Sequence, residues 1–83
     1  MGNQEPEIEE RADRVAARAF GRCLKHKRKD AGLTRADLSR RAGISASYLA
    51  SIERGSANPT LDTMVKLADV VGSGVAEMLS PGT

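Results

Sequence analysis

The sequence predicts an all-α fold, a compact domain of five helices, and three observations support that prediction. Apolar residues recur at spacings of three and four, the period of a helix, along most of the 83-residue chain. No segment alternates apolar and polar residues as a half-buried strand does. Helix-capping residues and glycines divide the chain into one long segment and several short ones.

The first segment is predicted to be an extended helix from residue 7 to residue 30 or 31. Acidic residues lie near its start, and Lys27, Arg28 and Lys29 lie near its end, so both groups complement the helix dipole. Gly32 follows, and glycine readily adopts the left-handed conformation of a helix end. The apolar positions of this helix are Ile8, Ala12, Val15, Ala16, Ala19, Phe20, Cys23 and Leu24.

Four shorter helices are predicted over residues 35–42, 46–54, 61–71 and 75–79. A residue that can cap a helix start precedes each of these helices. Asp37 lies three residues after Thr34, which suggests a capping box at the start of the helix over residues 35–42. The predicted caps are Thr34, Ser45, Thr60, and Ser73 or Gly74. The predicted stops are Gly43, Gly55, Gly72 and Pro81.

Charge is distributed unevenly, although the formal net charge is only +2. Residues 1–10 carry four glutamates and no base, a net charge of −4. Residues 11–54 carry 12 Lys or Arg against four acids, a net charge of +8, and residues 55–83 carry one Lys against three acids, a net charge of −2. A basic middle segment indicates a face for nucleic acid, although a solvated Arg-rich helix would give the same counts.

Composition excludes several function classes. The single cysteine, Cys23, cannot form an internal disulfide or a thiolate zinc site, and this favours a reducing, cytoplasmic setting. His26 is the only histidine and has no carboxylate at a spacing that would orient it, so we expect no enzyme, metal or cofactor site. No apolar run approaches the ~18–20 residues of a membrane span, and the acidic N-terminus is unlike a signal peptide.

Residues 42–45, Ala-Gly-Ile-Ser, join two of the short predicted helices. A turn of three or four residues that contains Gly sets two helices at about 90–120°, the arrangement of a helix-turn-helix. Ala42 and Gly43 are small enough to let the helices approach closely, and Ile44 can fill the space beneath the turn. Such a turn also occurs in helical bundles that do not bind DNA.

Four motifs at fixed spacings resemble the phage repressor and Cro type of helix-turn-helix domain, the XRE family. They are Gly-Leu-Thr before residue 35, the Ala-Gly-Ile-Ser turn, Ile-Glu-Arg-Gly at residues 52–55 and Asn-Pro-Thr-Leu at residues 58–61. The resemblance covers roughly residues 20–79 and implies the family's five-helix fold. We expect a DNA-binding domain over residues 13–80, an acidic extension over 1–12 that continues into the first helix, and a tail over 81–83.

The resemblance implies that the second helix of the motif enters the major groove of duplex DNA and that the first is anchored on the backbone. Thr34 and Arg35 would contact phosphate, because free N–H groups and a cation at a helix start attract anions. Alternatively, Thr34 is only a cap and Arg35 is only solvated. Arg54 and Asn58 would contact the backbone beyond the second helix, and Lys25 is a further candidate.

The side chains on the expected base-reading face are mostly small. None of its residues is Arg, Gln or Asn, the side chains that make bidentate contacts to guanine or adenine, so we expect DNA shape or cooperative binding to supply much of the specificity. Tyr48 is the one large side chain, and it can alternatively pack beneath the first helix of the motif. The reading positions are Ala46, Ser47, Tyr48, Ala50 and Ser51.

The resemblance also implies two structural contacts. Arg28 and Glu53 are expected to form a buried ion pair that ties the first helix to the end of the third. Relatives dimerise through the last helix, so Val75, Met78 and Leu79 are expected at a homodimer interface, with Met78 as the first candidate, although some of these residues must serve the core of the monomer. Ile8, Ala12 and Val15 of the extended first helix can add a second contact surface.

The resemblance implies sequence-specific binding of double-stranded DNA by a homodimeric transcriptional regulator at a promoter operator, acting as a repressor or as an activator and repressor. The Ser-Tyr-Leu and Ile-Glu-Arg sequences in residues 47–54 are similar to those of restriction–modification controller proteins. One alternative is an antitoxin that binds a protein partner through the acidic segment 1–12 as well as DNA. A second alternative is a helical scaffold that does not bind DNA.

Overall fold

The computed structural model describes the chain from residue 4 to residue 79, and describes side chains from residue 14 onward. Within residues 4–79 it has five α-helices and no strand, which confirms the predicted all-α fold. The helices are α1 (Gln4–Asp30), α2 (Arg35–Ala42), α3 (Ala46–Arg54), α4 (Leu61–Val70) and α5 (Val75–Met78). The predicted tail over 81–83 and the side chains of Ile8 and Ala12 lie outside the described parts.

Three helix boundaries differ slightly from the predicted ones. The backbone of α1 begins at Gln4, three residues before the predicted start. α4 ends one residue early because Val71, with φ −91° and ψ 4°, serves as its C-cap, and Leu79 serves as the C-cap of α5. Both cap residues still donate a backbone N–H to a carbonyl four residues earlier, to Leu67 and Val75 respectively.

The predicted caps begin α2, α3 and α4. Thr34, Ser45 and Thr60 have extended backbones, and each accepts a hydrogen bond from the backbone N–H three residues later. Removing such a cap typically costs about 1 kcal/mol, so these three residues set the helix starts. Gly43 and Gly55 end α2 and α3 in the left-handed conformation, at φ 73° and 79°.

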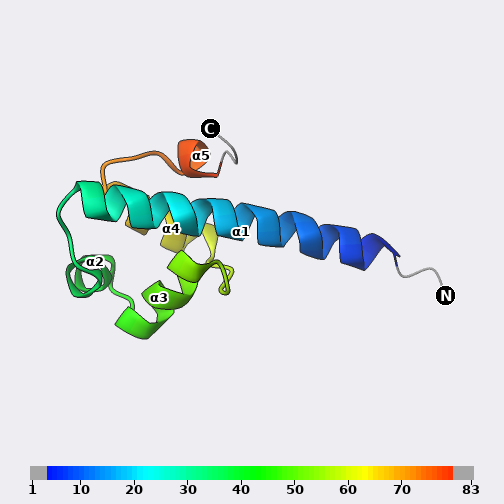
Figure 1. The fold of residues 1–83 in the computed structure, drawn as a ribbon, viewed down its shortest axis with the longest axis horizontal. Helices are drawn as coiled ribbons and strands as arrows, with labels where there is room; N and C mark the ends of the chain where they lie inside the picture. Colours follow the sequence, from blue (N-terminus) through cyan, green and yellow to red (C-terminus); the bar gives the residue numbers. More distant parts are fainter. Residues whose placement is uncertain (1–3, 80–83) are drawn as a thin grey trace.

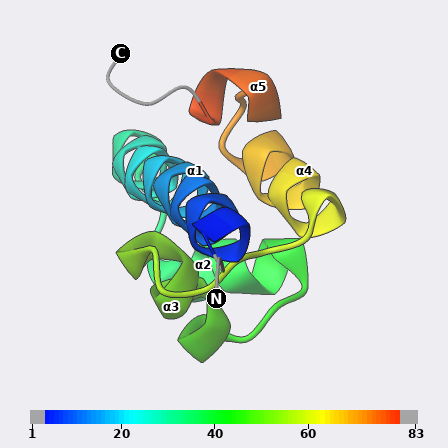
Figure 2. The same ribbon diagram turned by 90° about the vertical axis from the view of Figure 1, so that its right-hand side faces the viewer.

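The hydrophobic core joins all five helices. α1 packs on α3 and on α5, which lie on opposite sides of it, while α2 packs on α3 and α4 (Figures 1 and 2). The N-terminal part of α1 extends beyond the other helices (Figure 1). The large side chains that are fully buried are Phe20, Leu24, Leu38, Leu49, Ile52, Leu67 and Met78.

α1 and α3 approach each other closely enough to require glycine. A Cβ atom built on Gly21 would collide with the carbonyl oxygen of Ile52. A Cβ on Gly55 would lie 2.7 Å from Cγ of Arg18 and 3.1 Å from its Cα. These two contacts place the end of α3, and the turn that follows it, directly against α1. None of the described helices is both long and apolar enough to cross a membrane.

Candidate nucleic-acid interface

α2 and α3 form a helix-turn-helix unit. Gly43 takes the left-handed conformation and donates its N–H to carbonyls of Ser39 and Arg40, and Ile44 then donates its N–H to Ser39. The half-buried Ile44 side chain packs against the core, where the sequence predicted it would fill the turn. The turn therefore holds α2 and α3 at a defined angle and leaves one face of α3 outside the core.

The outward face of α3 is formed by the expected reading residues. Ala46 and Ser47 are exposed, and Ala50 and Ser51 are half-buried, while Leu49 and Ile52 on the opposite face are fully buried. Tyr48 is half-buried and packs against the hydrophobic core. Its position fits the packing interpretation and leaves part of the side chain at the surface.

The start of α2 is closed by a reciprocal pair of hydrogen bonds. The Thr34 hydroxyl oxygen accepts from the N–H of Asp37 at 3.0 Å, and Oδ2 of Asp37 accepts from the N–H of Thr34 at 3.1 Å. The Thr34 N–H and hydroxyl, together with Arg40, lower the pKa of the Asp37 carboxyl. Thr34 is thus a cap in this structure, and its exposed position also leaves it accessible to a phosphate.

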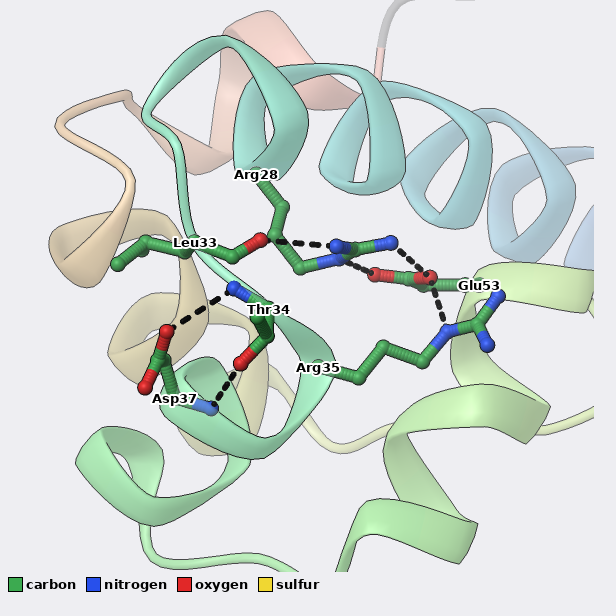
Figure 3. Close-up of polar contacts among 6 residues, drawn as sticks. All are labelled: Arg28, Leu33, Thr34, Arg35, Asp37 and Glu53. Carbon is green, nitrogen blue, oxygen red and sulfur yellow. Dashed lines mark hydrogen bonds and ion pairs between the residues drawn. The ribbon is translucent and has the colours of Figure 1, made fainter.

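A three-residue cluster joins α1, α2 and α3 behind this helix start (Figure 3). Arg28 donates from Nε to Oε2 of Glu53 at 2.7 Å and from Nη2 to Oε1 at 3.2 Å. Its Nη1 donates to the carbonyl of Leu33 at 2.9 Å, just before α2. Arg35 donates from Nε to Oε1 of Glu53 at 3.0 Å. The carboxylate of Glu53 therefore has a partner on each of its oxygens.

The electrostatics of this cluster leave positive charge at the surface. The Glu53 side chain is 1% exposed, that of Arg28 is 8% exposed and that of Arg35 is 48% exposed. Burial disfavours the charged form of Glu53, but the hydrogen bonds and charges of Arg28 and Arg35 outweigh it and lower its pKa. Two guanidinium groups share one carboxylate, and the more exposed of the two stands at the first position of α2.

The remaining backbone-contact candidates are also at the surface. Arg54 is exposed and donates from Nη2 to the hydroxyl of Ser51 at 3.2 Å, which links it to the reading face. Asn58 is exposed in the turn between α3 and α4, and Lys25 is exposed on α1. The structure brings together Arg35 and Glu53, and Arg54 and Ser51. Among the side chains of residues 14–79, Lys25 forms no hydrogen bond or ion pair with any of these residues.

The model of the helix-turn-helix family matches residues 24–78, which include α2, the turn and α3. This chain belongs to the helix-turn-helix family, and the XRE-type resemblance inferred from its motifs is confirmed. It is a transcriptional regulator with a helix-turn-helix DNA-binding domain. The family match also ends at Met78, the last residue of α5.

The regulator is similar to several curated proteins. It is 41% identical over 54 residues to the HTH-type transcriptional regulator y4dJ of Sinorhizobium fredii, over 65% of this chain and 70% of that protein. It is 38% identical over 63 residues to an immunity repressor of Bacillus phage phi105, over 76% of this chain and 44% of the repressor. The match thus spans less than half of the phage repressor's length.

Solved structures of regulators share the fold. ClgR, a clp gene regulator from Corynebacterium glutamicum, superposes with a TM-score of 0.74 at 28% identity, over 77% of this chain and 68% of that chain. The restriction-modification controller protein C.AhdI from Aeromonas hydrophila superposes with a TM-score of 0.70 at 31% identity. That match covers 75% of this chain and 94% of the controller.

Sequence reasoning missed two polar contacts of the regulator. The first joins Arg35 to Glu53. These residues are 18 positions apart in the sequence, so no local spacing pattern predicts the contact. The second is at α5, where Glu77 accepts from the hydroxyl of Ser73 at 3.0 Å and from the N–H of Gly74 at 3.3 Å. These bonds and the nearby charge of Lys27 lower the pKa of Glu77. The three-residue spacing of Gly74 and Glu77 was the available signal.

The structure corrects one expectation about the dimer interface. Met78 is 1% exposed and belongs to the core with Phe20 and Leu67, so its side chain is not available to a second copy of the folded chain. Met78 thus lies on the face of α5 that packs against the core. Val75 and Leu79 pack against the same core but remain half-buried, so they still present apolar surface.

Proposed function

We propose that this regulator binds a specific duplex DNA operator as a homodimer and thereby controls transcription from a promoter. The observation that carries the proposal is the position of Arg35, which is fixed by Glu53 of α3 and still half exposed at the start of α2. Backbone N–H groups in the first turn of a helix have no acceptor within the helix, and together with a cation they favour a phosphate. Thr34 and Arg35 would contact one stretch of backbone, and Arg54 and Asn58 would contact the backbone on the other side of the groove.

The surface of α3 sets what the regulator reads. Its exposed Ser and Ala side chains can touch base edges and thymine methyl groups but cannot make the bidentate contacts of Arg, Gln or Asn. Sequence-dependent shape of the duplex and simultaneous binding of two subunits would then supply much of the specificity. Similarity to a restriction-modification controller protein over 94% of that chain supports a controller-type role for this small regulator.

Selection of bound sequences from a random duplex pool tests the proposal. Two related half-sites with centres about 34–36 Å apart, or a multiple of that distance, are expected for a symmetric dimer. The affinity for the selected duplex should exceed the affinity for random duplex at the same salt concentration by at least about 1,000-fold. Equal affinity for the selected and random duplexes would overturn operator recognition.

Sedimentation velocity tests the homodimer. Val75 and Leu79 are the residues of the expected interface that keep apolar surface, so Val75→Glu or Leu79→Glu should shift the regulator toward monomer and weaken operator binding. Val65→Glu is a matched control because Val65 is an apolar residue of α4 that is 43% exposed and belongs to neither expected contact surface. A dimer that persists in both α5-region variants would exclude this surface.

A further inference from the structure

A row of cations lies on one face of α1 beside the helix-turn-helix unit. Residues four, four, three and four positions apart share one face of a helix. Every member of the row is exposed, and no acidic residue occurs between residues 14 and 29. At 1.5 Å per residue the row extends over roughly 22 Å of helix. Its members are Arg14, Arg18, Arg22, Lys25 and Lys29.

The N-terminal end of this row meets the turn between α3 and α4. The stem of Arg18 lies over Gly55, since a Cβ built on Gly55 would be 2.7 Å from Cγ of Arg18. Arg14 lines a recess of about 80 Å³ with Ala17 and the turn residues 55–58. Asn58, a proposed phosphate contact, therefore borders the same recess as Arg14. Figures 1 and 2 show this turn passing beside α1.

The turn itself has no cation to offer a phosphate. Its residues between Gly55 and Asn58 are Ser56 and Ala57. Among the side chains of residues 14–79, no carboxylate forms an ion pair with Arg14 or Arg18. Arg14 and Arg18 therefore bring cations from α1 to the turn that the proposed function places at the DNA backbone, in addition to Arg54 at the end of α3.

We propose that Arg14 and Arg18 of the extended α1 bind backbone phosphates of the duplex next to the α3–α4 turn. This inference rests on the proposed function and adds a binding surface to it, outside the helix-turn-helix unit. Contacts to phosphate carry no sequence information, so the two arginines strengthen binding to operator and to random duplex equally. They supply the positive charge that Ser56 and Ala57 lack.

The experiment measures affinity as a function of salt concentration for a selected duplex and a random duplex. Each phosphate contact contributes about 0.9 to the slope of log affinity against log salt concentration. Arg14→Gln and Arg18→Gln should each make the negative slope shallower by about 0.9. Each should also weaken binding to both duplexes roughly fivefold to tenfold at 0.1 M salt. Glutamine keeps Cβ and Cγ, so the packing of residue 18 on Gly55 is retained.

Two further variants separate a phosphate contact from other effects. Lys66→Gln removes the same charge from α4, where Lys66 pairs with Asp62, and should change the slope by less than half as much. Arg14→Lys and Arg18→Lys keep the charge and should retain most of the slope. Slopes of the glutamine variants equal to that of the wild type, or equal loss in the lysine and glutamine variants, would overturn the inference. Failure of the wild-type chain to bind any duplex would instead overturn the proposed function.

Discussion

Arg35, the first residue of α2, donates from Nε to Oε1 of Glu53, the penultimate residue of α3, at 3.0 Å. Arg28 of α1 holds the same carboxylate through two hydrogen bonds. Glu53 thus fixes the start of α2, which is proposed to contact the DNA backbone, relative to α3. Arg35 therefore serves both the fold and the proposed interface. The two arginines differ in exposure, so removing each should have a different effect.

Arg35→Gln is expected to weaken DNA binding much more than it weakens folding. The Arg35 side chain is 48% exposed, and ion pairs in such positions contribute at most about 1 kcal/mol to stability. Loss of one phosphate contact should lower the salt slope of binding by about 0.9. Arg40→Gln is the control, because Arg40 lies on the same helix and its exposed side chain pairs with Asp37 instead. Equal salt slopes for Arg35→Gln and the wild type would contradict the phosphate contact.

Glu53→Ala is expected to destabilise the fold by about 3–5 kcal/mol, because it leaves Arg28 buried without its partner. Urea unfolding followed by circular dichroism measures the change. DNA binding should fall with the folded fraction, and the affinity corrected for folded protein should also fall, because Arg35 loses the carboxylate that fixes its position. An unfolding midpoint equal to that of the wild type would show that the ion pair contributes nothing to stability.

Stability should fall in acid partly through Glu53. The two arginines outweigh the effect of burial and hold the pKa of Glu53 below its ordinary value in the folded state. A carboxyl whose folded pKa is lowered stabilises the fold above its unfolded pKa of about 4.3, and this contribution is lost as the pH falls through the folded pKa. Asp37 and Glu77 also have lowered pKa values and act in the same direction.

Urea unfolding at pH 7, 5, 4 and 3 tests this dependence in the wild type and in Glu53→Gln. The variant should be less stable at pH 7 and should lose less stability between pH 5 and pH 3, since residue 53 no longer titrates. The dependence that remains in the variant reports Asp37, Glu77 and the other carboxyls. Parallel pH profiles for the two proteins would exclude Glu53 as a contributor.

The local features of the fold were predictable from sequence because they depend on neighbours in the chain. Thr34 caps α2 and Gly43 ends it through bonds that span three to five residues, and such spacings can be read directly. Contacts between distant segments were accessible only where the family resemblance supplied them, as for Arg28 and Glu53. Arg35 forms its bond to Glu53 across 18 residues, so periodicity and capping gave no signal for it.

Apolar side chains pose a related difficulty. Met78 and its neighbours Val75 and Leu79 have similar hydrophobicity, and their order in a four-residue helix does not decide which of them turns inward. The choice is made by the space between α1 and α4, where Met78 joins the core and is 1% exposed. Sequence could therefore propose α5 as a candidate interface, while the division of its side chains between core and surface required the tertiary structure.

Gly21→Ala is expected to destabilise the fold although alanine favours a helix over glycine by about 1 kcal/mol. Gly21 lies inside α1, and a Cβ there would collide with the carbonyl oxygen of Ile52, so α1 and α3 would have to separate. Inserting an atom into a packed contact typically costs about 1–3 kcal/mol, and here the obstructing atom belongs to the backbone and cannot rotate away. Because the shift also moves the end of α3, the affinity for DNA should fall as well.

Gly72→Ala is the matched control for that variant. Gly72 has φ +72° and nothing within 4 Å of an added Cβ, so its substitution carries only the strain of the left-handed conformation, about 1–2 kcal/mol. Urea unfolding should therefore give a loss of stability for both variants, but only Gly21→Ala should reduce the affinity of the folded protein for DNA. A Gly21→Ala variant as stable as the wild type would mean that α1 and α3 lie farther apart than described.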